Sequence, residues 1–386
     1  AKLYADTDLE TLKDYLAAHL IMDASSSLSD DFYAANFDFF STAMSGITEQ
    51  KPRWKRAMSI PNSILGEAVG QMYVKKYFPE ENKQKMLEIV GQLQKSLGEH
   101  IAALDWMSDE TKEYAEKKLS SFTVKIGYPD KWKDYSSLTV DPKLSYYDNL
   151  RSANAWYVAD NLSKLGQKTD KSEWGMTPQT VNAYYNPTTN EICFPAAILQ
   201  PPFFNIDADD AINYGAIGVV IGHEMTHGFD DQGRLFDAEG NMTNWWTAED
   251  EAKFKEKTAV LVNQYSEVEI LPGLHADGQL TLGENIADHG GVSIAYTALH
   301  NALGDTLPAD IDGFNVDQRF FLGFAHLWAQ NATDEEKARL TKLDVHSLAE
   351  NRVNITVRNF PFFFKAFDIQ EGDPMWRPES ERVNIW

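Results

Sequence analysis

The stretch VVIGHEMTHGFDDQG (residues 219–233) constrains the fold most, because it places His223, Glu224 and His227 in the order H-E-x-x-H after an apolar run. Residues four apart on an α-helix project from the same side, so the two histidines can face one ion. Glu224, one position round, would stand beside that ion. Zinc binds neutral imidazole nitrogens, and a catalytic zinc keeps one position for water. The pattern predicts a zinc-binding helix, with a chance match on a surface helix as the alternative.

Two histidines do not complete a zinc site, so a third ligand is needed. In the arrangement H-E-x-x-H-x-x-G-x-x-H a third histidine would follow, but Asp230 and Gly233 stand at the Gly and His positions here. In the downstream stretch TLGENIADHGG, Glu284 could supply a carboxylate ligand and give a His₂Glu site. The competing interpretation is a capping box, with Thr281 as N-cap and Glu284 at the third helical position. The intact H-E-x-x-H motif favours the metal ligand.

Carboxylates beside the predicted ligands have a second possible role. Asp288 follows Glu284 by four residues and could accept a hydrogen bond from a ligand histidine, which would fix the tautomer of its ring. Asp230, in the turn after His227, is a candidate for the same task.

The predicted chemistry is hydrolysis. Bound zinc lowers the pKa of its water and polarises a carbonyl. Glu224 would take the proton of that water and deliver it to the leaving amine. The developing oxyanion needs a further donor. His346 and Arg352, in KLDVHSLAENRVN, are candidates, although spacing alone favours surface positions for both.

Composition excludes several classes of partner. The 386 residues suggest two or three domains. A net charge of -23 argues against nucleic acid and anionic membranes as partners. No apolar run approaches the length of a membrane span, and the first residues show no signal-peptide pattern. The single cysteine, Cys193, allows no intrachain disulfide, which suits a cytoplasmic or a bacterial exported protein.

Periodicity predicts a mainly α (α+β) chain with a small β element. Between residues 78 and 107, Leu87, Val90, Leu93, Leu97, Ile101 and Leu104 form a one-sided helical stripe. Ser108 is placed as the N-cap of the next helix. Turn residues become frequent after Ile126, and residues 180–204 read as a hairpin around an Asn-Pro-Thr-Thr-Asn turn. Helical patterns dominate again from Asn213 onward.

Five stretches together resemble the neprilysin family of zinc metallopeptidases, which includes endothelin-converting enzymes and bacterial oligopeptidases. They are residues 180–204, VIGHEMTHGFDDQG, TLGENIADHGG, DVHSLAENRVN and the terminal RVNIW. The resemblance covers nearly the whole chain. It implies a thermolysin-like zincin catalytic lobe at 181–386, part of a helical cap lobe at 1–125, and connecting segments at 126–180. Between the lobes, the family encloses a chamber that admits oligopeptides.

The resemblance also implies roles for individual residues. One Zn²⁺ would be held by His223, His227 and Glu284, with Glu224 as the catalytic base. Asp288 would partner a ligand histidine, His346 would stabilise the transition state, and Arg352 would hold a substrate carbonyl. Asn182 and Ala183 would pair with the substrate main chain as an added strand does. An apolar pocket for the residue after the cleaved bond would draw on Ile198, Phe203, Val219, Val220 and Trp328.

The expected function is a zinc-dependent endopeptidase that cuts oligopeptides on the amino side of hydrophobic residues. The alternatives are a non-catalytic member that binds peptides or proteins, and a C-terminal fragment that needs an N-terminal partner chain. Glu224 beside both histidines favours the peptidase. Family members are longer at the N-terminus, so we expect the N-terminal chain of the same precursor as a possible partner. The lone cysteine indicates a bacterial member, with a periplasmic, cell-surface or secreted location favoured over the cytoplasm.

Overall fold

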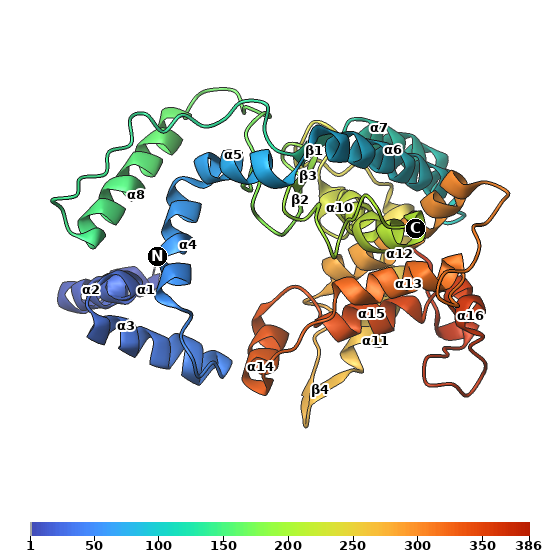
Figure 1. The fold of residues 1–386 in the computed structure, drawn as a ribbon. Helices are drawn as coiled ribbons and strands as arrows, with labels where there is room; N and C mark the ends of the chain where they lie inside the picture. Colours follow the sequence, from blue (N-terminus) through green and yellow to red (C-terminus); the bar gives the residue numbers. More distant parts are fainter. Residues whose placement is uncertain (1) are drawn as a thin grey trace. The chain divides into compact units, whose positions relative to one another are not determined.

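The structure is a computed structural model that describes residues 2–386 (Figure 1). Its internal contacts divide the chain into two units. Unit 1 comprises Ala1–Gly66, Lys133–Asp170 and Thr333–Glu336, and unit 2 comprises Glu67–Trp132, Lys171–Ala332 and Lys337–Trp386. Helices greatly outnumber strands, which confirms the predicted mainly α class. The division of the sequence near residues 125 and 180 stays a prediction.

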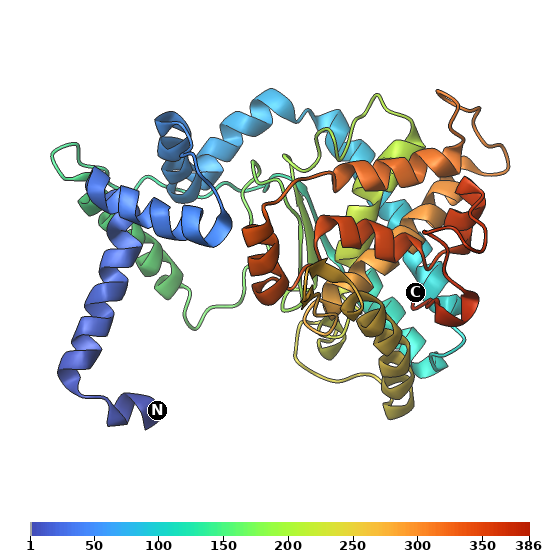
Figure 2. The ribbon, with the colours of Figure 1, turned by 90° about the horizontal axis from the view of Figure 1, so that it is seen from below.

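Unit 1 consists of helices and the loops that join them, seen as the darker blue helices and the green α8 in Figures 1 and 2. Few of its side chains are shielded from solvent: among its described residues only Ala24, Ser25, Gly66 and Ala153 are buried. Its elements are α1 (Lys2–Asp6), α2 (Leu9–Ala24), the 3₁₀ turn η1 (Ser25–Ser27), α3 (Asp30–Asn36), the π-helix η2 (Phe37–Ala43), α4 (Arg53–Ile64) and α8 (Tyr146–Ser163).

Unit 2 holds the other elements, apart from the first residues of α5 and α14, which belong to unit 1. Its helices are α5 (Gly66–Tyr77), α6 (Glu80–Ala103), α7 (Asp109–Ser120), α9 (Asp210–Asn213), α10 (Val219–His227), α11 (Ala248–Ser266), α12 (Leu282–Leu303), α13 (Val316–Leu327), α14 (Asp334–Leu343), α15 (Ala349–Val357) and α16 (Pro361–Phe367). Three short helical turns complete it: η3 (Tyr214–Gly218), η4 (Gly233–Leu235) and η5 (Glu379–Glu381). Within residues 2–386, no helix combines the length and the apolar character that crossing a membrane requires.

The predicted amphipathic helix and its successor are present as α6 and α7. Val90, Leu93, Leu97 and Ile101 of the predicted stripe are buried in the core. Leu87 is exposed instead, so its place in the stripe was wrong. The cap of α7 is confirmed, because the Ser108 side chain accepts a hydrogen bond from the backbone of the first turn.

The predicted hairpin is also confirmed, as β2 (Tyr184–Asn186) and β3 (Glu191–Pro195). The turn between them ends at Asn190, which adopts a left-handed conformation with φ of 51°. That conformation is tolerated by asparagine better than by most residues. β1 (Thr123–Gly127) pairs in parallel with β3, so the sheet order is β1-β3-β2 and β2 lies at its edge. A second sheet contains β4 (Glu269–Leu271) and β5 (Leu274–His275).

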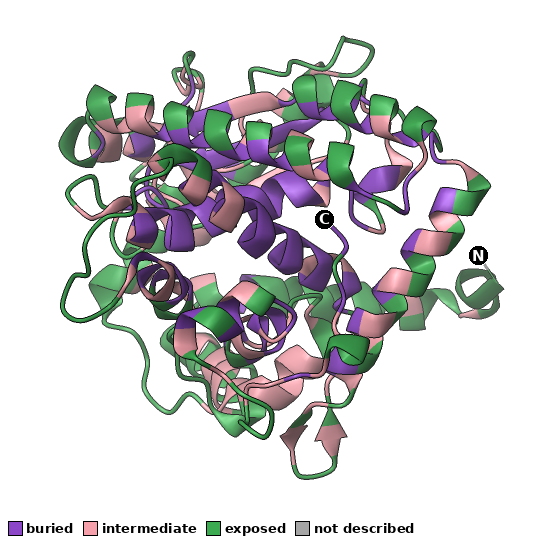
Figure 3. Ribbon diagram, turned by 90° about the vertical axis from the view of Figure 1, so that its right-hand side faces the viewer, coloured by how far each residue is buried: buried purple, intermediate pink, exposed green. Residues whose placement is uncertain are grey.

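The core of unit 2 contains α10 and α12, which pack against each other through glycines. A Cβ built on Gly222 would lie 2.9 Å from the Cα of Gly291, closer than real side chains approach backbone. The two helix backbones therefore touch at this point, as only glycine permits. Figure 3 shows helices in the interior of unit 2 that are buried around most of their circumference, and α12 is buried along most of its length. This close approach brings residues of α12 within reach of the α10 histidines.

Candidate active site

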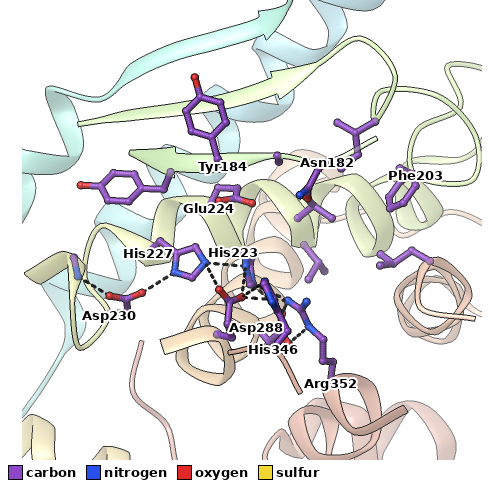
Figure 4. Close-up of a pocket in the computed structure, with 18 of the residues that line it drawn as sticks. Asn182, Tyr184, Phe203, His223, Glu224, His227, Asp230, Asp288, His346 and Arg352 are labelled. Carbon is purple, nitrogen blue, oxygen red and sulfur yellow. Dashed lines mark hydrogen bonds and ion pairs between the residues drawn. The ribbon is translucent and has the colours of Figure 1, made fainter. Parts of the chain in front are cut away.

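His223 and His227 project from the same side of α10 into one cavity of unit 2, as their four-residue spacing predicts (Figure 4). Their Nε2 atoms lie 3.0 Å apart. Glu284, from the first turn of α12, faces both: its Oε2 is 3.2 Å from His223 Nε2 and its Oε1 is 3.5 Å from His227 Nε2. A tetrahedral ion with bonds of 2.0–2.1 Å holds its ligand atoms about 3.3 Å apart. The three side chains therefore fit a zinc ion.

The competing interpretation of Glu284 as part of a capping box is wrong. Thr281 precedes α12, but its side chain makes no cap hydrogen bond to the helix backbone. Its hydroxyl instead donates to the carbonyl of Asp277 and accepts from the side chain of Asn285. The carboxylate of Glu284 is thus left to face the histidines.

Each histidine has its own carboxylate partner on the far ring nitrogen. His223 Nδ1 lies 2.8 Å from Asp288 Oδ1, and His227 Nδ1 lies 2.6 Å from Asp230 Oδ2. A carboxylate only accepts, so both Nδ1 atoms carry a proton, and in the neutral form of each ring the Nε2 lone pair faces the gap between the rings. Asp288 and Asp230 were candidates for one task, and the structure gives each of them one histidine. This arrangement prepares both Nε2 atoms to bind a metal.

The electrostatics of the cluster favour positive charge between these ligands. Burial disfavours the charged form of Glu284, yet the two histidines hold the pKa of this carboxyl far below its ordinary value. Burial would lower the pKa of His227, but hydrogen bonds with Asp230 and Glu284 raise it well above the usual range. Glu284 Oε2 is buried and accepts no hydrogen bond within the described chain. A metal ion bound here would be a partner for Glu284 Oε2 and would place a positive charge between the two histidines and Glu284.

Glu224 stands beside this set. One oxygen of its carboxylate and one ring nitrogen of each histidine lie within 4.8 Å of one another, so Glu224 could itself be a ligand on distance alone. Glu284 faces both Nε2 atoms directly, at 3.2 Å from that of His223 and 3.5 Å from that of His227. Burial raises the pKa of Glu224 above its ordinary value, against the opposing effect of the two histidines. A carboxyl so placed is suited to gain and lose a proton.

Arg352 and Trp328 form a pair at the wall of the cavity. The Nε and one terminal nitrogen of Arg352 each donate to Asp288 at 2.7 Å, and its guanidinium lies 3.9 Å from the centre of the Trp328 ring. The same terminal nitrogen is 3.7 Å from Glu284. Arg352 therefore lies inside the cluster, and Trp328 contributes a stacking face besides its expected apolar wall.

His346 reaches the cavity from the loop before α15. Its Nε2 is 3.3 Å from Glu284 Oε2, while its Nδ1 donates to Asp344 at 2.7 Å. Its side chain remains 46% exposed, unlike the two α10 histidines. Sequence reasoning missed Asp344, although an aspartate two residues before a candidate histidine in KLDVHSL is a recognisable signal for a local turn.

The cavity around these groups has a volume of about 520 Å³, and the sequence-predicted substrate residues line it. Asn182 and Ala183 lie directly before the edge strand β2. The five side chains predicted for the apolar pocket also line the cavity: Ile198, Phe203, Val219, Val220 and Trp328. Tyr184, which sequence reasoning did not single out, lines it as well. The cavity thus combines apolar side chains with polar groups, and both lie next to the two histidines.

Comparison with known proteins agrees with this geometry. Residues 182–383 match the profile described as peptidase family M13, and residues 1–129 match its N-terminal profile. The chain belongs to peptidase family M13. This is the family of neprilysin-like zinc metalloendopeptidases, so the sequence-based identification is confirmed.

Among M13 relatives, the endothelin-converting enzyme 1 of Mus musculus is 38% identical over 398 residues, which cover 100% of this chain and 51% of that protein. The structure of the Mycobacterium tuberculosis zinc metalloprotease Zmp1 in complex with an inhibitor has a TM-score of 0.96 at 41% identity, covering 100% of this chain and 59% of Zmp1. PepO from Lactobacillus rhamnosis gives 0.87 at 33% identity, with 95% and 56% covered. The predicted zincin fold is confirmed, and the chain spans about half the length of the curated relatives it matches.

Proposed function

We propose that this chain carries the catalytic centre of a zinc-dependent endopeptidase that cleaves oligopeptides on the amino side of hydrophobic residues. The observation that carries the proposal is the convergence of His223, His227 and Glu284, at 3.0 to 3.5 Å from one another, with Glu224 beside them. One Zn²⁺ held there would polarise the scissile carbonyl and lower the pKa of a water ligand.

The chain's own residues would then move the protons and hold the charge. Glu224, buried and with a raised pKa, would accept the proton of the attacking water and pass it to the leaving amine. His346, turned towards Glu284 and hydrogen-bonded to Asp344, would donate to the developing oxyanion. Arg352, fixed by Asp288, would hold a substrate carbonyl at the cavity wall.

The sheet edge supports an extended substrate. β2 pairs with β3 on one side only, and Asn182 and Ala183 continue from it along the cavity. A peptide laid there could form main-chain hydrogen bonds as an added strand. The apolar side chains that line the same cavity, Phe203 and Val220 among them, would accept a hydrophobic residue after the cleaved bond.

The test is a matched pair of quenched fluorescent peptides with Phe or Asp after the intended cleavage site. We expect the full chain with zinc to cleave the Phe peptide faster, and mass spectrometry of the products to place the cut before Phe. Chelator and Glu224→Gln should each abolish cleavage. Tight binding of the Phe peptide without any cleavage would instead support the non-catalytic binding member, and equal rates for both peptides would overturn the specificity.

A second candidate, a chain whose activity needs an N-terminal partner from the same precursor, rests on unit 1. Large apolar side chains there are more than half exposed: Leu3, Tyr4, Leu9, Tyr15, Leu16, Leu20, Phe39 and Trp54. Large apolar side chains exposed in this number suit a surface that another polypeptide covers. Additional polypeptide of the kind present in the longer relatives would cover them.

Co-expression tests this candidate. The N-terminal half of a closely similar M13 protein, supplied as a separate chain, should co-purify with this chain and raise cleavage of the Phe peptide. Full activity of this chain as a monomer, unchanged by the added chain, would contradict it.

A further inference from the structure

Lys118, near the end of α7, is one of the most deeply buried large side chains of the protein, with 1% of its surface exposed. None of the carboxylates between residues 2 and 386 forms an ion pair with it in the structure. Aromatic rings surround it instead, with the Nζ atom 5.6–5.9 Å from the ring centres of Tyr185, Phe229 and Trp245. A buried lysine without a counter-ion is costly unless its ammonium group is fully hydrogen-bonded.

Three backbone carbonyls provide those hydrogen bonds. The Nζ atom donates to the carbonyl of Gly228 at 2.6 Å, and to those of Gly233 and Phe236 at 2.7 Å. An ammonium group has three donors, so its capacity is used completely. All three acceptors belong to the segment that follows α10, here called the Asp230 segment (residues 228–236). Lys118 therefore ties both ends and the middle of this segment to α7.

The Asp230 segment supports one of the proposed zinc ligands. Asp230 Oδ2 accepts from His227 Nδ1 at 2.6 Å, while its Oδ1 accepts from the backbone of Gln232 and Gly233. The segment is folded tightly against the end of α10, since a Cβ on Gly233 would lie 1.7 Å from the His227 carbonyl oxygen. The path of the backbone thus decides where the Asp230 carboxylate stands.

We propose that Lys118 is a positioning residue for metal binding: it fixes the Asp230 segment so that Asp230 holds the His227 ring with its Nε2 towards the ion. The inference rests on the proposed zinc centre. Without the ammonium group, three buried carbonyls lose their donor, and the segment must rearrange to find other partners. Loss of the carboxylate that orients a ligand histidine typically weakens metal affinity about 10- to 100-fold.

The main experiment is Lys118→Met, which keeps a long side chain and removes the donors. Zinc affinity is measured by competition with a chromophoric chelator, on chains shown to be folded by circular dichroism. We expect a loss of affinity of about 10-fold or more. Cobalt loading gives an independent readout, because the visible absorption of Co²⁺ reports ligand geometry. We expect a shifted spectrum in the variant. If Lys118→Met does not fold, Lys118→Gln is measured in its place: its amide group has two donors for the three carbonyls, so we expect a smaller loss of zinc affinity.

Lys125→Met is the matched control. Lys125 is also buried, but it pairs with Glu191 at 2.8 Å and donates to the carbonyl of Glu173, and neither partner belongs to the Asp230 segment. The Lys125→Met variant should be less stable than the wild type, while its zinc affinity and its cobalt spectrum stay as in the wild type. Equal loss of affinity in both lysine variants would overturn the proposal, because general destabilisation would then explain it.

A double-mutant cycle that combines Lys118→Met with Asp230→Asn tests whether Lys118 acts on His227 through Asp230. If Lys118 acts through Asp230, the two substitutions together should weaken zinc binding little more than Asp230→Asn alone. Independent, additive losses would overturn the proposal. Wild-type chain that fails to bind zinc, or binds it equally well after His227→Ala, would instead refute the zinc centre itself, which separates the two failures.

Discussion

Gly291 of α12 lies against the backbone of α10 at His223: a Cβ on Gly291 would be 2.6 Å from the Val219 carbonyl oxygen and 2.9 Å from the His223 nitrogen. The contact sets the distance between the helix that carries both histidines and the helix that carries Glu284. Any side chain at position 291 must push these helices apart.

Gly291→Ala should therefore destabilise the protein by about 1–3 kcal/mol, as overpacked core sites do. Zinc affinity should fall as well, because Glu284 moves away from the histidines. Denaturant unfolding and a zinc titration measure the two effects. Gly91→Ala is the control: Gly91 lies in α6 with open space around it, so alanine there should be neutral or stabilising by about 0.5–1 kcal/mol. Equal behaviour of the two variants would refute the packing argument.

Two glutamates at the site should separate metal binding from turnover. Glu284→Gln removes a charged ligand, so zinc affinity and activity should both be lost. Glu224→Gln should bind zinc like the wild type and lose about 10²- to 10⁴-fold in kcat, the usual contribution of a general base. Atomic absorption measures the zinc content of each variant, and cleavage of the Phe peptide measures its activity. Loss of zinc from the Glu224 variant would indicate that Glu224 is itself a ligand.

His346→Phe keeps a planar ring and removes the donor that faces the cavity. We expect kcat to fall about 10²-fold, as when one oxyanion donor is removed, with KM and zinc affinity nearly unchanged. Steady-state kinetics on the Phe peptide give both constants. A rise in KM alone would show that His346 binds the substrate in its ground state.

Lys118 should make stability depend on pH. Burial lowers the pKa of Lys118 to about 7, although Asp230 and Asp237 oppose the shift. In the unfolded chain a lysine titrates near 10.5, so between about pH 7 and 10.5 the unfolded state binds more protons and stability rises with pH. Below about pH 7 Lys118 is an ammonium group in both states, which is the form that donates to all three carbonyls of the Asp230 segment in the folded chain, and the dependence ends.

The difference in unfolding free energy between wild type and Lys118→Met, measured with chelator present, isolates this effect. It should shift in favour of the wild type by at most about 1.4 kcal/mol per pH unit through that window. A pH-independent difference would show that Lys118 keeps an ordinary pKa in the folded chain.

Much of the site could be predicted from the spacing of residues along single helices. The four-residue steps from His223 to His227 and from Glu284 to Asp288 are helical repeats, so their common faces could be read directly. The competing cap at Thr281 could not be dismissed in that way, because its hydroxyl finds partners only once the preceding turn is folded. The hairpin was predictable for the same local reason.

Contacts between distant segments were not predictable. Lys118 precedes Gly228 by more than one hundred residues, and in the sequence it is one basic residue on an amphipathic helix. Gly222 and Gly291 look like ordinary helix glycines until their backbones meet. Leu87 was misplaced because a stripe with a regular period does not show where the covered face ends. Only the folded chain decides which of these positions are enclosed.

The interleaved composition of unit 1 has a consequence for how the protein can be made. The chain passes from one unit to the other after Gly66, Trp132, Asp170, Ala332 and Glu336. Unit 1 thus cannot be completed on the ribosome until nearly the whole sequence has been synthesised, and no single cut can separate it from unit 2. Expression of either unit by itself would require excising and rejoining several segments, so substitutions are better studied in the uncut polypeptide.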